Sequence, residues 1–153
     1  MPRFHLVAEV LIDRPLDPIR AFFADVNSPV LWDRSVSKVT LESNGPLAVG
    51  ARFTTIGPSR GGAEGKRSDY RVVAVNGDET RVALENSPMF RSAVWTMRLL
   101  KEGQRTLVTC EIDMLMSWLY APVGFLLALN RTALATDLQF LRRAIEYGEV
   151  AKR

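Results

Sequence analysis

The sequence has only one cysteine and one histidine among its 153 residues. A lone cysteine, Cys110, excludes an intrachain disulfide framework. With His5 as the only imidazole, the chain also lacks the ligand set that a structural zinc site needs. Any Ser-His-Asp or Cys-His catalytic machinery would have to use His5. We expect His5 to point outward, because it is out of phase with its apolar neighbours, and Cys110 to be an inert core thiol.

Charge of one sign does not dominate either. Twenty Lys and Arg are mixed with 17 Asp and Glu, which gives a net charge of +3 and a pI of about 9.3. Such a mild balance does not favour a nucleic-acid partner. Segment 57–65 is rich in glycine, but it lacks the lysine and hydroxyl pair of a phosphate-binding loop. We therefore expect no cofactor, no metal ion and no nucleic acid.

Long hydrophobic runs are also missing. The most apolar segment, 114–130, is shorter than a membrane-spanning helix and is interrupted by Ser117 and Pro122. We expect it to form a buried strand end and helix start, with contact at a membrane interface as the less favoured alternative. No signal peptide is apparent at the N-terminus, so we expect a cytoplasmic protein.

What the sequence does contain is a regular succession of short periodic segments. Apolar residues alternate from Phe4 to Ile12, which predicts a half-buried strand. Helical spacing follows over 19–26, with the helix beginning either at an Asp17 cap or nearer Pro15. A serine and a proline at 28–29 predict the start of a second short helix. Six further strands are predicted at 36–41, 51–56, 70–75, 80–85, 93–100 and 107–116, and a last helix from about Leu119 to Tyr147.

The segregation of these strands and helices predicts an α+β domain with an antiparallel sheet. The length fits a single domain over residues 1–153. A sheet of this size must curl to bury one face. The last helix is the only element long enough to fill the concavity.

Several short motifs occur in a familiar order: Asp13-Arg14-Pro15, Asp25 with Asn27 and Pro29, Trp32, Val49-Gly50-Ala51-Arg52-Phe53 and Gly103-Gln104-Arg105-Thr106. In this order the chain resembles the SRPBCC superfamily, which is START-related and polyketide cyclase/dehydrase-like. The resemblance implies a helix-grip fold, in which a curved antiparallel sheet of about seven strands wraps around a long C-terminal helix. Two short helices follow the first strand, and the fold encloses an apolar cavity. Members bind or transfer lipids, sterols, quinones and polyketides, and some are aromatases or cyclases.

The last helix carries an apolar stripe with one amide. The stripe consists of Val123, Leu127, Asn130, Leu134, Leu138, Leu141 and Ile145. A buried amide without a partner costs about 1–3 kcal/mol, so Asn130 either orients a ligand, bonds to nearby backbone or water, or lies at the edge of the stripe. Asp137 lies beside the stripe, and we expect it to face solvent.

Two strands place methionines and a tryptophan on the expected inner face, with Met97 and Trp95 on one and Met114 on the other. Arg91 shares the parity of the first of these strands. It is either a cation at the cavity mouth that binds a carboxylate or phenolate, or a solvated strand-end arginine, which we favour. The pattern leaves open which face Phe53 and Tyr70 occupy. The predicted ligand-binding residues are Trp32, Phe53, Tyr70, Arg91, Trp95, Met97, Met114, Trp118, Leu127, Asn130 and Leu134.

These features predict a binder or carrier of a small hydrophobic molecule such as a lipid, a quinone or a polyketide-like compound. The alternative is an aromatase or cyclase in which Arg91, Tyr70 or a hidden carboxylate polarises a carbonyl group. A third reading is an interaction module whose apolar helix start docks on a membrane or partner. No catalytic residue can be assigned from the sequence.

Overall fold

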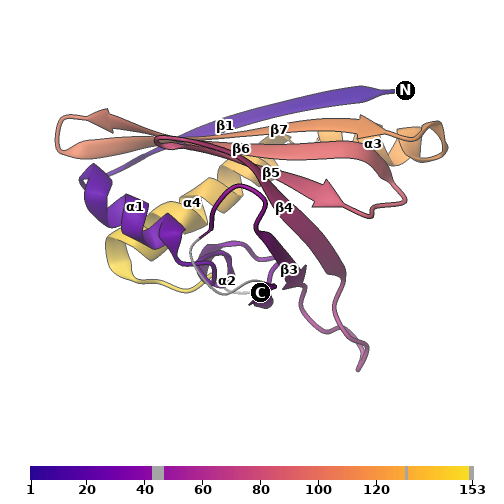
Figure 1. Ribbon diagram of the computed structural model, residues 1–153, viewed down its shortest axis with the longest axis horizontal. Coiled ribbons are helices and arrows are strands. Elements are labelled where there is room, and N and C mark those ends of the chain that lie inside the picture. The colour runs from indigo at the N-terminus through magenta and orange to yellow at the C-terminus, as the bar shows by residue number, and fades with distance from the viewer. Residues whose placement is uncertain (43–46, 130, 152–153) are drawn as a thin grey trace.

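One antiparallel sheet of seven strands dominates the structure (Figure 1). The computed structural model describes residues 1–42, 47–129 and 131–151. The spatial order of the strands is β1-β7-β6-β5-β4-β3-β2, so the last strand pairs with the first. The strands are β1 (Arg3–Ile12), β2 (Lys38–Leu41), β3 (Arg52–Ile56), β4 (Arg67–Asn76), β5 (Glu79–Glu85), β6 (Phe90–Glu102) and β7 (Arg105–Met116). Figure 1 shows the β4, β3 end turning down beside the helices, which confirms the predicted curl.

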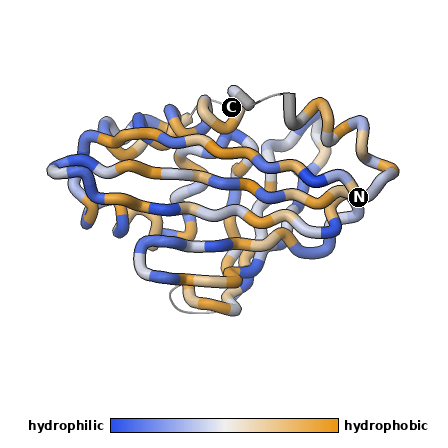
Figure 2. The backbone as a smooth tube through the Cα atoms, turned by 90° about the horizontal axis from the view of Figure 1, so that it is seen from above, coloured by the Kyte–Doolittle hydropathy of each residue, from blue (hydrophilic) through white to orange (hydrophobic). Residues whose placement is uncertain are grey.

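The alternation of apolar and polar residues decides which face of the sheet is inner. Ala8, Cys110 and Met97 are opposed across β1, β7 and β6 and therefore share one face. Along β7 the even positions are buried at 106, 108, 110, 114 and 116. Figure 2 shows hydrophobic and hydrophilic segments alternating along the strands. The predicted inward parity of β6 and β7 is confirmed.

The outer face of the sheet carries paired charges. The Arg98 guanidinium contacts Glu79 at 2.7 Å and also contacts Glu111. Arg52 and Arg71 both lie 3.3 Å from Glu85. The mixed charge of the sequence is thus arranged as a solvated ladder of ion pairs. Exposed pairs of this kind contribute little to stability.

Two short helices lie between the first and second strands. α1 spans Leu16–Ala24 with Pro15 at its N-cap and no side-chain cap, so the start nearer Pro15 is the observed one. α2 spans Pro29–Trp32 and begins with a proline, as the sequence predicts. Figure 1 shows both on the same side of the sheet as the C-terminal helix.

The C-terminal helical segment comprises a short 3-10 helix η1 (Trp118–Tyr120), α3 (Ala121–Leu129) and α4 (Arg131–Tyr147). The sequence predicts one helix from about Leu119 to Tyr147; the structure describes helix over 121–129 and 131–147, and residue 130 lies outside the described residues. Leu138 and Leu141 of α4 are fully buried. They pack with Val10, Ile12, Ile19, Val108 and Cys110 to form the core. α4 therefore packs on the inner face of the sheet, as expected for the predicted α+β helix-grip fold.

The segment after β7 corrects one expectation. Met114 and Met116 are buried, as predicted for a strand end. The helix start, however, leaves Trp118, Leu119 and Phe125 exposed. A Cβ built on Gly124 would lie 2.3 Å from the Met116 sulfur and 2.5 Å from the Phe4 ring. Gly124 is thus a point at which α3 meets the sheet, and Phe125 of the same helix is exposed.

Candidate ligand-binding site

Three aromatic side chains from β3, β4 and β6 meet on the inner face. Phe53 and Tyr70 are directly opposed across two strands, and their rings stack at 5.3 Å between centroids with planes 16° apart. Trp95 meets Tyr70 edge to face at 5.6 Å. All three side chains are half-buried rather than buried. The structure thereby assigns Phe53 and Tyr70 to the inner face, which the sequence left open.

This aromatic group borders the core on one side. Trp95, Met97 and Leu134 pack against the core cluster yet keep part of their surface accessible, whereas Met114 is buried. The inner face is therefore fully packed near α1 and the C-terminal half of α4, and incompletely covered around Tyr70. Partly accessible aromatic and methionine side chains form a surface that can adapt to an apolar ligand.

Polar groups lie at the edge of this apolar surface. Burial raises the pKa of the Tyr70 phenol, and the nearby Asp33 carboxylate raises it further, while hydrogen bonds with Ser68 and Thr55 act in the opposite direction. Burial also raises the pKa of the Cys110 thiol to about 12, with smaller contributions from Asp33 and Asp137. The Asp33 carboxylate thus raises the pKa of a side chain on β4, Tyr70, and of one on β7, Cys110.

Asp137 of α4 corrects another expectation. The sequence predicts that it faces solvent, but its side chain is only 30% exposed. Burial raises the pKa of Asp137, and Asp33 raises it further, although Arg34 at 3.7 Å favours the charged form. A half-buried carboxyl beside a second carboxylate is the arrangement from which acid and base pairs are built.

The loop after α2 holds Asp33 and Arg34 in place. The Asp33 carboxylate accepts hydrogen bonds from the backbone N–H of Ser35 at 2.9 Å and from its hydroxyl at 2.6 Å. The Arg34 guanidinium lies 4.8 Å from the centre of the Phe140 ring. These contacts tie the loop to α4. Both charged residues are consequently positioned by tertiary contacts on the helix side of the site.

Trp32 brings a donor into the same region. Its ring packs against the core, and its indole N–H is buried without a hydrogen-bond acceptor among the described residues. An unpaired buried donor costs about 1–3 kcal/mol. A ligand acceptor that reached this nitrogen would recover part of that cost.

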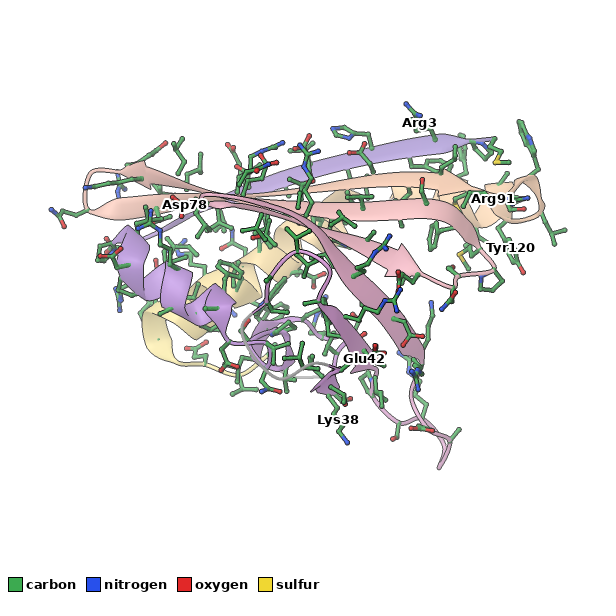
Figure 3. The ribbon with its side chains drawn as sticks, viewed as in Figure 1. Arg3, Lys38, Glu42, Asp78, Arg91 and Tyr120 are labelled. Atoms are coloured by element: carbon green, nitrogen blue, oxygen red, sulfur yellow. The ribbon has the colours of Figure 1, made fainter. Side chains whose placement is uncertain are left out.

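Other predicted residues lie away from the aromatic group. Arg91 is exposed, and it is the extra residue at an irregularity in β6, where Phe90 pairs with Met116 and Ser92 with Leu115. Figure 3 shows Arg91 near Tyr120 at the α3 end of the sheet. Trp118 is 70% exposed. The side chain of Leu127 and the whole of Asn130 lie outside the described residues.

Sequence reasoning missed Asp33 as a site residue and assigned Asp137 to solvent. The available signals were weak. Asp33 directly follows Trp32 in a short helix, and Asp137 lies one position before Leu138 of the apolar stripe. Their proximity depends on how α2 and α4 pack, which no local pattern records.

Two hollows over the described residues are lined mainly by charged side chains. One of about 520 Å³ lies among Glu42, Arg52, Arg67, Asp69, Glu85 and Asn86. The other, of about 330 Å³, is bordered by Leu11, Asp13, Arg105, Arg142 and Glu146. Neither is the apolar cavity that the sequence predicts. The candidate site is therefore the half-buried inner face itself.

The described part of the chain contains no group of three or more His, Cys, Asp or Glu side chains placed to hold a metal ion. None of its helices has both the length and the apolar character needed to cross a bilayer.

Comparison with known proteins shows similarity in structure but not in sequence. No protein-family model matches the chain, and no curated protein matches it. Major latex-like protein 151 from Panax ginseng superposes with a TM-score of 0.64 at 18% identity, over 91% of this chain and 98% of that one. A truncated norcoclaurine synthase from Thalictrum flavum gives a TM-score of 0.72 at 11% identity, over 95% of each chain.

A third similar structure is the di-domain ARO/CYC StfQ from the steffimycin biosynthetic pathway. It matches with a TM-score of 0.72 at 11% identity, over 95% of this chain and 50% of that one. The chain thus spans about half of the di-domain protein. At such identities the shared property is the fold. The protein has a helix-grip fold, as expected from the sequence.

Proposed function

We propose that the protein binds a small hydrophobic molecule on the inner face of its sheet, between the strands and α4. The observation that carries this proposal is the group of Phe53, Tyr70 and Trp95, whose rings are in mutual contact yet incompletely buried. Aromatic surface left accessible beside a packed core is costly unless a ligand covers it. A lipid, a quinone or a polyketide-like compound has the required apolar area.

The polar groups at the edge of this surface indicate which polar atoms the ligand carries. The Trp32 indole N–H is a buried donor without an acceptor among the described residues, and the Tyr70 phenol, whose pKa burial raises, is a second possible donor. Together they suit a ligand with an apolar body and one carbonyl or hydroxyl oxygen. Burial of apolar area, at about 25 cal/mol per Å² before binding costs, would supply most of the affinity.

The structural neighbours support a binding role and an enzymatic role equally. Their names include a latex-like protein, a synthase and an aromatase/cyclase. What they share with this chain is the fold, which hosts different chemistries. The proposal therefore rests on the inner face of this chain.

Native mass spectrometry of the purified protein, followed by organic extraction, tests the proposal. We expect a defined apolar compound to co-purify, and its addition to raise the thermal midpoint. Trp95→Ala should weaken its binding about tenfold or more, because a large contact area is lost. The matched control is Leu100→Ala, since Leu100 is an exposed residue on the outer face of the same strand. A clean apo mass with no thermal shift from a panel of apolar compounds would contradict the proposal.

Catalysis on the same surface is the second candidate, and Asp137 is the observation that favours it. Burial and the neighbouring Asp33 raise the pKa of Asp137, which would suit this carboxyl to act as a general acid. With the compound identified above, Asp137→Asn should abolish turnover but leave its binding within a few-fold. Binding without any conversion by the wild-type protein leaves only the carrier role.

A further inference from the structure

The end of the molecule formed by η1 and α3 exposes an unusual amount of apolar surface. Leu119 is 79% exposed, Trp118 70%, and Phe125 and Leu126 67% each. Adjacent large apolar side chains exposed to this degree mark an interaction surface. We call these four residues the α3 patch.

The exposure follows from how α3 is attached to the sheet. Gly124 is the residue of α3 that lies against Phe4 of β1 and Met116 of β7, so closely that a Cβ would collide with both. A glycine lets the helix approach the sheet closely but contributes no side chain to the contact. Phe125 and Leu126, the next two residues, are exposed and point away from it.

The residues around the α3 patch carry positive charge only. Segments 1–8, 86–101 and 114–136 contain no Asp or Glu. They form one end of the sheet, because Leu115 pairs with Arg3 on one side and with Ser92 on the other. Figure 3 shows Arg3, Arg91 and Tyr120 at this end. Both arginines are exposed, and neither forms an ion pair within the part of the chain that the structure describes.

The nearest acidic side chains in the strands leading to this end have side-chain partners of their own. The Asp113 carboxylate lies 2.8 Å from a ring nitrogen of His5. Glu85 lies 3.3 Å from both Arg52 and Arg71. Arg3 and Arg91 therefore add positive charge at this end of the sheet that no ion pair among the described residues offsets.

We propose that the α3 patch docks this end of the protein on an anionic lipid surface. Exposed leucine and phenylalanine would enter the interfacial region, while Trp118 and Tyr120 suit the boundary between headgroups and acyl chains. Arg3 and Arg91 would meet anionic headgroups, and no carboxylate in these segments opposes them. A second copy that docked through the same surface would bring no carboxylate from these segments to pair with the arginines, which favours the lipid. Docking does not require that the inner face bind a ligand.

Flotation with vesicles tests this, comparing phosphatidylcholine alone with an equal mixture of phosphatidylcholine and phosphatidylglycerol. We expect the full-length protein to float with the anionic vesicles, and less so at high salt. Phe125→Ser/Leu126→Ser should reduce the bound fraction about tenfold or more. Leu100→Ser, at an exposed leucine on the outer face of β6, is the control that should bind like the wild type.

The charged rim is tested separately. Arg3→Glu/Arg91→Glu should weaken binding to the anionic vesicles roughly tenfold or more. Lys38→Glu/Lys66→Glu makes the same change in net charge at exposed positions outside the three segments, and should weaken binding far less. Circular dichroism and the thermal midpoint confirm that each variant is folded. The residues substituted in the two double variants, Phe125 and Leu126 in one and Arg3 and Arg91 in the other, are all exposed, so we expect both variants to fold.

The wild-type protein gives an independent readout. Anionic vesicles should shift its tryptophan emission to shorter wavelength, and Trp118→Phe should remove most of that shift. Absence of vesicle binding overturns the proposal. Equal binding to neutral vesicles that is insensitive to the arginine variants also overturns it. So does self-association that Phe125→Ser/Leu126→Ser abolishes in the absence of any vesicle binding, because the partner is then a second copy.

Discussion

Tyr70 and Phe53 lie directly opposite each other on β4 and β3, and their rings stack with centroids 5.3 Å apart. The edge of Trp95, from β6, meets the same tyrosine. Tyr70 of β4 thus contacts aromatic side chains from both β3 and β6. The candidate site depends on this contact, because it brings the aromatic surface beside the core.

The first prediction concerns the energy of that stack. A double-mutant cycle with Phe53→Leu and Tyr70→Leu should give a coupling free energy of about 0.5–1.5 kcal/mol in urea unfolding. Tyr70→Phe is the control, since it keeps the ring and should retain most of the coupling. A coupling near zero would mean that the two rings contribute only their separate burial.

Asp137 provides a prediction about pH. Burial raises its pKa above the ordinary value of 3.8, so the native state holds a proton that the unfolded state has released. Stability therefore falls as pH rises from 3.8 through the raised pKa. Asp137→Asn avoids this loss. Its free energy of unfolding should therefore increase relative to that of the wild type as pH rises across this interval.

Urea unfolding at a series of pH values measures the difference. Asp17→Asn is the matched control, because Asp17 is 90% exposed and should show no such gain. If the free energy of unfolding of Asp137→Asn instead falls relative to the wild type as pH rises, the Arg34 contact outweighs burial, and the raised pKa assigned to Asp137 is wrong.

Glu146 should behave in the opposite sense. Burial opposes its charge, but the backbone N–H of Asp13 at 2.7 Å and Arg142 at 3.1 Å hold its pKa below the ordinary 4.5. Its contribution is present above pH 4.5 and is lost as pH falls through the lowered pKa. Glu146→Ala leaves the Asp13 N–H without this acceptor and should cost about 1–3 kcal/mol at neutral pH.

Urea unfolding of Glu146→Gln helps to separate charge from hydrogen bonding, because glutamine keeps an acceptor oxygen but cannot ionise. We expect an intermediate loss that shrinks toward low pH. The exposed Glu102→Gln should show neither effect. An unchanged stability profile for Glu146→Gln would show that the carboxylate charge contributes nothing here.

Cys110 yields a prediction about reactivity. Its thiol is buried, with a pKa of about 12, so almost no thiolate exists at pH 8. A disulfide reagent should modify the native protein far more slowly than the urea-unfolded protein. Because Cys110 lies beside the candidate site, a bound apolar compound should slow the reaction further by stabilising the native state. Rapid labelling of the native protein would show that the inner face opens without unfolding.

Local sequence patterns predicted much of the architecture because they depend on short-range periodicity. The alternation in β1, β6 and β7 and the stripe of α4 each follow from burying one face of a regular element. Boundaries were less accurate. The last strands extend beyond their predicted limits to Glu102 and Arg105, because hairpin pairing continues into polar residues that carry no apolar signal.

The site was less predictable than the fold. Trp95, Met97 and Leu134 follow from parity and helical spacing, and the structure places them beside the core. Asp33 comes from a loop whose position depends on contacts with α4, such as that between Arg34 and Asp137. The predicted role of Asn130 concerns a residue outside the described part of the chain.

The sequence by itself determined the class of fold, the inward faces of β1, β6 and β7 and the absence of disulfides, since each depends on composition or on a repeat of two or three to four residues. The tertiary structure alone decided that Tyr70 meets both Phe53 and Trp95, that Asp137 is half-buried and that Phe125 and Leu126 of α3 lie at the surface. These three relationships arise between segments far apart in the chain or from the way a helix packs on the sheet. Burial there depends on which surfaces meet, and no local pattern specifies that.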